Sequence, residues 1–88
     1  MLFMVIERFK DARATGERFE RMGRMLPDGV VYHASWVEPS GARCFQIMEP
    51  PDAALLQVWA SRWEDLADFE ILPVLTSQQF WAERDKRS

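Results

Sequence analysis

A β-hairpin is predicted by residues 30–49, VVYHASWVEPSGARCFQIME. Its two halves are rich in β-branched and aromatic residues, which favour strands. The segment Glu38-Pro39-Ser40-Gly41 between them fits a type I turn that ends in a left-handed glycine. We therefore expect strands over 30–37 and 42–49, joined by a three-residue loop. Because this hairpin lies in the middle of the chain, the elements on either side of it decide the fold.

Each side of the hairpin carries one helix pattern and one strand pattern. Residues 2–8 are a short apolar run typical of a strand, and residues 13–26 then change to helical spacing. A second helix is expected over 52–66, and residues 69–75 are again strand-like. Pro73 predicts that this last strand lies at the sheet edge, because proline donates no hydrogen bond to a neighbour. The order β-α-β-β-α-β predicts an α+β, ferredoxin-like sandwich with a four-stranded antiparallel sheet.

The chain is expected to form a single domain over residues 1–88. Thr76 and Gln79 have the spacing of a capping box, which predicts a final short helix carrying Phe80 and Trp81. The residues that follow are mostly charged, so we expect 81–88 to be a frayed tail.

Four stretches of the sequence carry a resemblance to a known family. They are residues 1–9 (MLFMVIERF), 35–38 (SWVE), 43–49 (RCFQIME) and 69–77 (FEILPVLTS). Together they resemble a bacterial family known only as a domain of unknown function, number 3303 in that series, and the resemblance covers nearly the whole chain. It implies a dimeric α/β-barrel, in which two four-stranded sheets face each other and the helices lie outside. It implies no established activity, and His33 is not part of the family pattern.

The composition predicts a homodimer. Of the 88 residues, 48% are hydrophobic and four are tryptophan, which is more large apolar surface than the core of so small a chain requires. Two helices cover only one face of the sheet, so we expect a second copy of the chain against the other face.

Charge and motif content argue against several classes of partner. The formal net charge of −3 disfavours binding to nucleic acid or to an anionic membrane, since both rest on clustered Lys and Arg. The apolar start of the chain meets Glu7 and Arg8 before it could span a bilayer, and the single Cys44 cannot close an intramolecular disulfide. The expected location is therefore cytoplasmic. No phosphate loop, dinucleotide fingerprint or metal motif occurs, so neither cofactor nor metal is predicted.

The hairpin register predicts which side chains share a sheet face. A three-residue loop places Glu38 opposite Ala42, and the other cross-strand pairs follow from that one. One face of the hairpin then holds Tyr32, Ala34, Trp36, Cys44, Gln46 and Met48.

The first strand offers two alternating sets of side chains. Leu2, Met4 and Ile6 form the fully apolar set and are expected beneath the helices. The alternate set, which contains Glu7, would then share the other face with Trp36 and the rest of the hairpin group. That face is aromatic with a few polar groups, as in a ligand pocket, although a sheet-to-sheet dimer interface fits equally well.

Glu7 is the candidate catalytic residue. A carboxyl group buried in an apolar strand has a raised pKa, which suits general acid or base chemistry. The alternative is a strand-end carboxylate that reaches water or pairs with an arginine. His33 is the only imidazole, so a multi-histidine metal site is not expected and a structural role is the simpler interpretation. In the expected register His33 lies on the opposite face from Cys44, so a Cys-His dyad is not expected, and Cys44 fits a small packed hydrophobe better than a nucleophile.

Three functions fit these patterns. The first is a dimeric barrel that binds a small, partly apolar molecule between its sheet and the partner subunit, through Glu7 and the ligand-binding candidates Tyr32, Trp36, Cys44, Gln46 and Met48. The second is cofactor-independent catalysis, such as monooxygenation or isomerisation, in which Glu7 handles the proton. The third is an assembly role in which the partner simply fills this sheet face. Cavity size and the pKa of Glu7 separate the three.

Overall fold

The structure is a computed structural model that describes the backbone of residues 1–87 and the side chains of residues 1–83. Its elements follow in the order β1 (Leu2–Phe9), α1 (Ala12–Met22), β2 (Val31–Val37), β3 (Arg43–Glu49), α2 (Ala54–Ser61), β4 (Ala67–Val74) and α3 (Ser77–Arg87). The four strands form one antiparallel sheet in the order β2-β3-β1-β4. This is the predicted α+β ferredoxin-like arrangement. β4 lies at the sheet edge, as Pro73 indicated.

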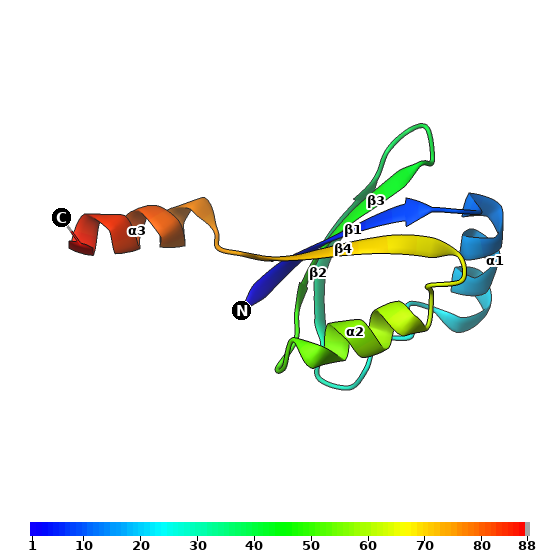
Figure 1. Cartoon of the computed structure of the whole chain (residues 1–88), viewed down its shortest axis with the longest axis horizontal. Coiled ribbons are helices and arrows are strands. Elements are labelled where there is room, and N and C mark those ends of the chain that lie inside the picture. Colours follow the sequence, from blue (N-terminus) through cyan, green and yellow to red (C-terminus); the bar gives the residue numbers. More distant parts are fainter. Residues whose placement is uncertain (88) are drawn as a thin grey trace.

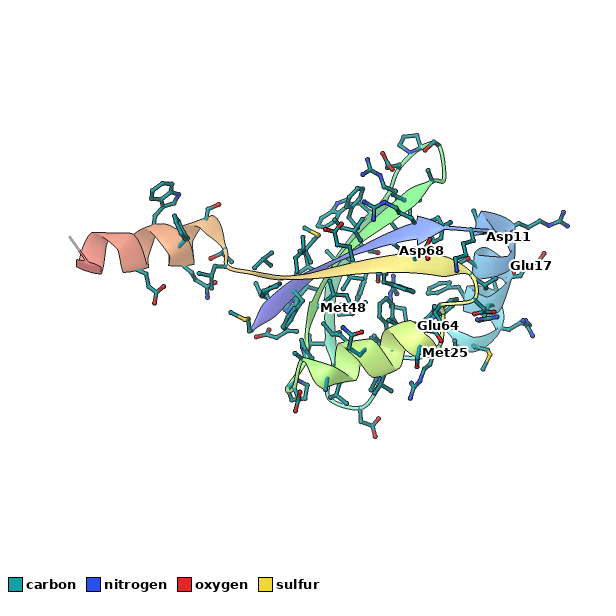
Figure 2. The ribbon with its side chains drawn as sticks, in the orientation of Figure 1. Asp11, Glu17, Met25, Met48, Glu64 and Asp68 are labelled. Atoms are coloured by element: carbon teal, nitrogen blue, oxygen red, sulfur yellow. The ribbon has the colours of Figure 1, made fainter. Side chains whose placement is uncertain are left out.

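Local sequence signals explain where α1 begins and ends. The Asp11 side chain caps its start by accepting a hydrogen bond from the backbone N–H of Ala14, at 3.0 Å, and Asp11 lies at that end of the helix in Figure 2. Gly23 ends the helix, because its φ of 67° is a conformation that glycine adopts without strain. The helix therefore stops four residues before the predicted Leu26.

The second helix is also shorter than the predicted 52–66. Regular helix ends at Ser61, and the chain continues in tighter turns, in which the N–H of Arg62 donates to the carbonyl of Trp59 and that of Trp63 to Ala60. These turns keep Trp63 on the same side as Trp59. Trp63 therefore joins Trp59 in the buried cluster although the regular helix is shorter.

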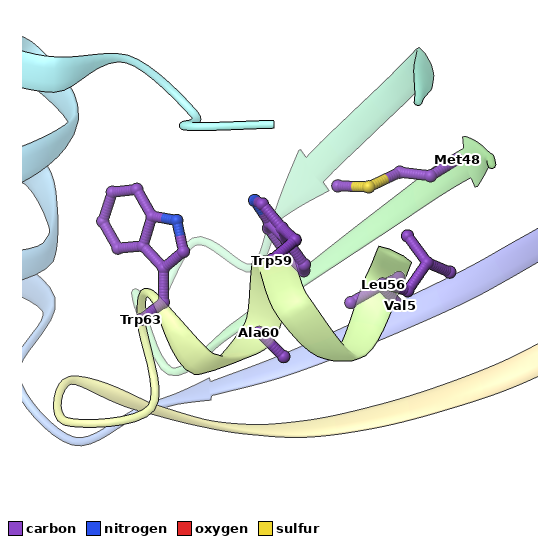
Figure 3. Packing of buried hydrophobic residues seen from close by; sticks show 6 residues of the cluster. All are labelled: Val5, Met48, Leu56, Trp59, Ala60 and Trp63. Carbon is purple, nitrogen blue, oxygen red and sulfur yellow. The ribbon is translucent and has the colours of Figure 1, made fainter. Parts of the chain in front are cut away.

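The hydrophobic core lies between α2 and one face of the sheet. Met48 lies between the sheet and α2 in Figure 2, and Figure 3 shows the whole buried cluster. Its members are Val5, Met48, Leu56, Trp59, Ala60 and Trp63. Phe69 of β4 meets the Trp59 ring edge-on, with the ring centroids 5.2 Å apart.

The predicted orientation of β1 is wrong. Val5 is fully buried in the core and Glu7 is only 5% exposed, so the set containing Glu7 lies beneath the helices. Leu2, Met4 and Ile6 lie on the opposite face, which no helix of the described residues covers; we call this the open face. The error has a simple cause: both alternating sets are largely apolar, and a period of two separates the faces without saying which one meets the helices.

The predicted hairpin register holds at one end and fails at the other. Tyr32 pairs with Met48 as expected, but the pairing shifts by one residue at His33, where β2 contains a bulge. Ser35 therefore lies opposite Gln46, and Trp36 lies opposite Phe45 on the open face.

The hairpin loop itself is longer than expected. The predicted turn forms, with the Gly41 N–H donating to the Glu38 carbonyl and Gly41 at φ 74°. The Glu38 N–H, however, donates to the carbonyl of Arg43 rather than pairing with Ala42. The loop thus has four residues, 39–42.

The last helix begins with the predicted capping box. The backbone N–H of Gln79 donates to Thr76 Oγ1, and the N–H of Thr76 donates to Gln79 Oε1. Figure 1 shows α3 extending from the end of β4 away from the sheet, at the opposite end of the molecule from α1. Its backbone is helical through Arg87. The expected fraying of 81–88 stays a prediction, and residue 88 lies outside the described residues.

Trp59→Ala should lower the free energy of unfolding by about 3–5 kcal/mol, the range for deleting a large buried aromatic side chain. Trp59 is 2% exposed and its indole also donates a hydrogen bond to the Arg24 carbonyl. Val58→Ala in the same helix is the matched control, since Val58 is 44% exposed and should cost less than about 1 kcal/mol. Urea unfolding followed by fluorescence or circular dichroism measures both. Equal losses in the two variants would contradict the packing described above.

Candidate functional site

A cavity of about 330 Å³ lies between the helix-facing side of the sheet and α1. Its floor comes from β1, β2 and β3, with Glu7, Ser35, Cys44 and Gln46 among the floor residues. Trp59 and Trp63 close it on the side of α2. The cavity is formed by one chain, whereas the ligand pocket predicted from the sequence lies between the sheet and a partner subunit.

The cavity exists because α1 presents small side chains to the sheet. Ala12, Thr15, Gly16 and Phe19 line it, at the spacing of one helix face, and only the last of these is large. A Cβ added at Gly16 would meet no atom within 4 Å. No residue of α1 is buried.

Polar contacts to α2 and the turns that follow it hold α1 in place. The Arg18 guanidinium forms a bidentate ion pair with Asp65, at 2.8 and 2.6 Å, and donates to the Arg62 carbonyl at 3.1 Å. The same guanidinium lies 5.6 Å from the centre of the Trp63 ring. The helix is thus fixed along one edge while its sheet-facing side stands over open space.

The segment after α1 is anchored to α2 and the turns that follow it through two consecutive carbonyl groups. The indole N–H groups of Trp59 and Trp63 both donate to the carbonyl oxygen of Arg24, at 2.9 and 3.0 Å. Arg62 Nη1 donates to the next carbonyl, that of Met25. These bonds fix the backbone at Arg24 and so determine where its side chain lies.

The Arg24 guanidinium lies at the polar end of the cavity. It stacks over the Tyr32 ring, 3.8 Å from the centroid, and its Nε donates to Gln46 Oε1 at 3.3 Å. Its Nη2 donates to Ser35 Oγ at 3.2 Å, and this hydroxyl also bonds to the Tyr32 hydroxyl at 2.6 Å. Arg24 therefore joins β2 and β3 to the chain that follows α1.

Glu7 lies next in the same chain of hydrogen bonds. Gln46 Nε2 donates to Glu7 Oε1, so one amide links the carboxyl group of Glu7 to the guanidinium of Arg24. Burial raises the pKa of Glu7 to about 7, although the positive charge of Arg24 acts in the opposite direction. A carboxyl group with a pKa near neutrality both donates and accepts protons under ordinary conditions.

The other candidate reactive groups are inactive or distant. Burial, followed by the nearby Glu7, raises the pKa of the Cys44 thiol to about 11, so the thiol stays protonated and is a poor nucleophile. His33 is exposed, and its Nε2 lies 3.1 Å from Glu49 Oε1. It does not line the cavity.

The structure brings together only some of the residues proposed from sequence. Glu7, Cys44 and Gln46 line the cavity, and Tyr32 supports Arg24 from outside it. Met48 is fully buried in the core beside α2.

Trp36 is the clear exception among the predicted ligand contacts. It is 57% exposed and lies on the open face, because the bulge at His33 reverses the side to which it points. Sequence reasoning also missed Arg24 and the small residues of α1. The spacing of Ala12, Thr15 and Gly16 on one helix face was a visible signal for the latter, but nothing local marked Arg24.

The family comparison covers almost the entire chain. The model of the family described as Domain of unknown function (DUF3303) matches residues 1–85. The chain belongs to this family. No curated protein and no solved structure matches this DUF3303 chain significantly.

Two features of the described residues bear on the classes of function. None of the helices they form is long and apolar enough to cross a lipid bilayer. The same residues hold no cluster of three or more His, Cys, Asp or Glu side chains placed to bind a metal ion. The cytoplasmic location of the DUF3303 chain stays a prediction.

Glu7 should make folding stability depend on pH. The pKa of Glu7 in the folded chain lies above its ordinary value of 4.5. The contribution of the Glu7 carboxyl group to folding stability is therefore fully present below pH 4.5 and is lost as the pH rises through about 7. The full loss corresponds to about 3 kcal/mol. Glu7→Gln keeps nearly the same side-chain shape but does not ionise. The urea midpoint of this variant should therefore change less between pH 5 and 8 than that of the natural chain, because these values lie on either side of the folded pKa of about 7. NMR titration of the Glu7 carboxyl carbon measures the pKa directly, and a value at or below the ordinary one would refute the assignment.

Proposed function

We propose that the DUF3303 chain binds a small, partly apolar molecule in the cavity beneath α1. The observation that carries the proposal is the cavity of about 330 Å³ itself, with mainly apolar walls and a few polar groups gathered at one end. Ligand sites in proteins commonly have this composition and a volume of roughly 300–1,000 Å³. A cavity kept only by accident of packing would be easily filled by larger side chains on α1, since Gly16 has open space in front of it.

A second candidate function is general acid or base catalysis by Glu7. The observation that favours it is that Glu7 lines the cavity with a pKa of about 7. A ligand whose reacting proton lay beside Glu7 would meet a group able to take it up or supply it. Cys44 adds no nucleophile to this candidate, because its thiol remains protonated.

The proposal includes a homodimer formed through the open face of the sheet. This face carries apolar side chains from all four strands: Leu2, Met4, Ile6, Trp36, Phe45, Ile47 and Leu72. Trp36 is 57% and Leu72 41% exposed, and no described helix covers either. In a two-fold symmetric dimer, these residues of one copy would pack against the same residues of the other copy. The partner then supports the sheet from behind and leaves the cavity within each chain.

Gly16→Leu should close the cavity without unfolding the chain. A leucine at this helical position has space for its Cβ and extends into the cavity, and it favours helix over glycine by up to about 1 kcal/mol. The neutral fluorescent probe N-phenyl-1-naphthylamine should bind the natural chain and lose at least about tenfold in affinity in this variant. Gly16→Ala is the control, since it gains helix propensity while leaving most of the space. Undiminished probe binding in Gly16→Leu would show that the probe, and the proposed site, lie elsewhere.

Light scattering coupled to size-exclusion chromatography should give the mass of a dimer at micromolar concentration. Trp36→Glu places a charge in the middle of the open face and should shift the mass towards that of the monomer. Val58→Glu puts the same charge on the outer surface of α2 and should leave the dimer intact. A monomer mass for the natural chain throughout the micromolar range would refute the homodimer.

A further inference from the structure

The polar end of the cavity holds one cation and one acid among the described residues. These are Arg24 and Glu7, which are linked through Gln46 rather than by direct contact. The remaining walls are largely apolar, with the aromatic rings of Phe19 and Trp63 among them. A molecule that fills the space therefore meets a charged group at one end and hydrocarbon elsewhere.

Arg24 retains unused hydrogen-bonding capacity. Its Nε and Nη2 donate to Gln46 and Ser35, and within residues 1–83 its Nη1 has no acceptor and its charge has no carboxylate partner in direct contact. Tyr32 on one side, at 3.8 Å, holds the guanidinium plane in position. The group is thus oriented in advance, which lowers the cost of binding an anion.

Glu7 does not neutralise Arg24 under mildly acidic conditions. Burial keeps the carboxyl group of Glu7 protonated below a pKa of about 7, so the polar end then carries the single positive charge of Arg24. A positive charge beside an apolar cavity favours an anionic partner. A phosphate dianion is less suited to the site, since it would need more than this one cation lining it.

We propose that the ligand of this cavity is a small, mostly apolar carboxylic acid whose carboxylate pairs with Arg24. The inference rests on the proposed binding function and names the chemical class of its ligand. A carboxylate matches the planar fork of a guanidinium, and the apolar part of the acid would lie against the aromatic walls beneath α1. Binding would displace water from the cavity and compensate the charge of Arg24 in the same step.

Such a ligand would couple binding to the uptake of a proton. Arg24 faces Glu7 from the segment after α1 and Cys44 faces it from β3, while Phe69 is its neighbour on β4. The cavity-lining residues of α1 and of the α2 region bring no further titratable group towards it. A bound carboxylate disfavours a second negative charge nearby, so it binds best when Glu7 is protonated. Affinity should therefore fall as the pH rises above about 7.

Phenylacetate and phenylacetamide are matched probes for this inference, because they share one shape and differ in charge. At about pH 6, phenylacetate should bind the natural chain at least about tenfold more tightly, as followed by NMR shifts of the Arg24 side-chain Nε–H. Its affinity should fall by several-fold or more at about pH 8.5, while that of the amide stays constant. Calorimetry at about pH 7.5, where Glu7 is largely ionised before binding, in buffers of different ionisation enthalpy should show proton uptake with the acid alone.

Arg24→Gln should weaken phenylacetate binding by about 10- to 100-fold. Arg13→Gln is the matched control, because the Arg13 side chain is 91% exposed and, among the described side chains, pairs with Glu17 on the outer side of α1. If Arg24→Gln fails to fold, the comparison of acid with amide in the natural chain still decides the question.

The outcomes separate this inference from the function on which it rests. Equal binding of acid and amide, with the neutral naphthylamine probe still bound, would overturn the carboxylate and leave the cavity a ligand site. Tighter binding of benzylphosphonate than of phenylacetate would also overturn it and assign a different class of anion. Failure of the naphthylamine probe as well as both phenylacetyl probes would refute the binding function itself.

Discussion

Two tryptophan N–H groups meeting on one carbonyl oxygen hold the helical layer of this domain together. The indoles of Trp59 and Trp63 donate to the Arg24 carbonyl, at 2.9 and 3.0 Å, and so tie the chain after α1 to the α2 region. The segment they anchor has two residues at positive φ, Gly23 and Met25, and no regular secondary structure to fix it. Buried indole groups need acceptors, and here both find the same one. The core and the polar end of the cavity therefore depend on the same pair of hydrogen bonds.

The position of Glu7 carries an energetic cost that its neighbours only partly offset. The Gln46 amide satisfies one carboxyl oxygen, and Arg24 lowers the cost of ionisation from a distance. Burial still prevails, because the pKa lies near 7 instead of at its ordinary value. An apolar residue at position 7 would avoid this cost, as β1 is otherwise apolar on this side at Phe3 and Val5. The hydrogen-bonded chain of Glu7, Gln46 and Arg24 therefore reduces stability at neutral pH. Such a cost is typical of a site for binding or proton transfer.

The order of the elements was predictable because local chemistry specifies it. Gly41 in the hairpin turn, Pro73 in the edge strand and the Thr76 capping box each act over a few residues, and each has the predicted effect in the structure. The faces of β1 were not predictable in this way. Both sets of side chains in this strand are apolar enough to be buried, and only the packing of α2 against Val5 determines which set is inside.

The hairpin register failed for a different reason. A bulge adds one residue to β2 at His33, and no glycine or proline marks the position. The shift moves Trp36 from the expected ligand face to the open face, and it brings Ser35 opposite Gln46. The bulge thus removes the aromatic side chain of Trp36 from the predicted pocket. It also brings the Ser35 hydroxyl group to the place where it accepts a hydrogen bond from Arg24.

The cavity likewise depends on contacts that the sequence does not show. The small residues of α1 leave space only because Arg18 holds that helix to Asp65 along its other edge. Small side chains on a helix ordinarily indicate close packing, so the sequence shows the space-giving residues but not the contacts that keep the space open.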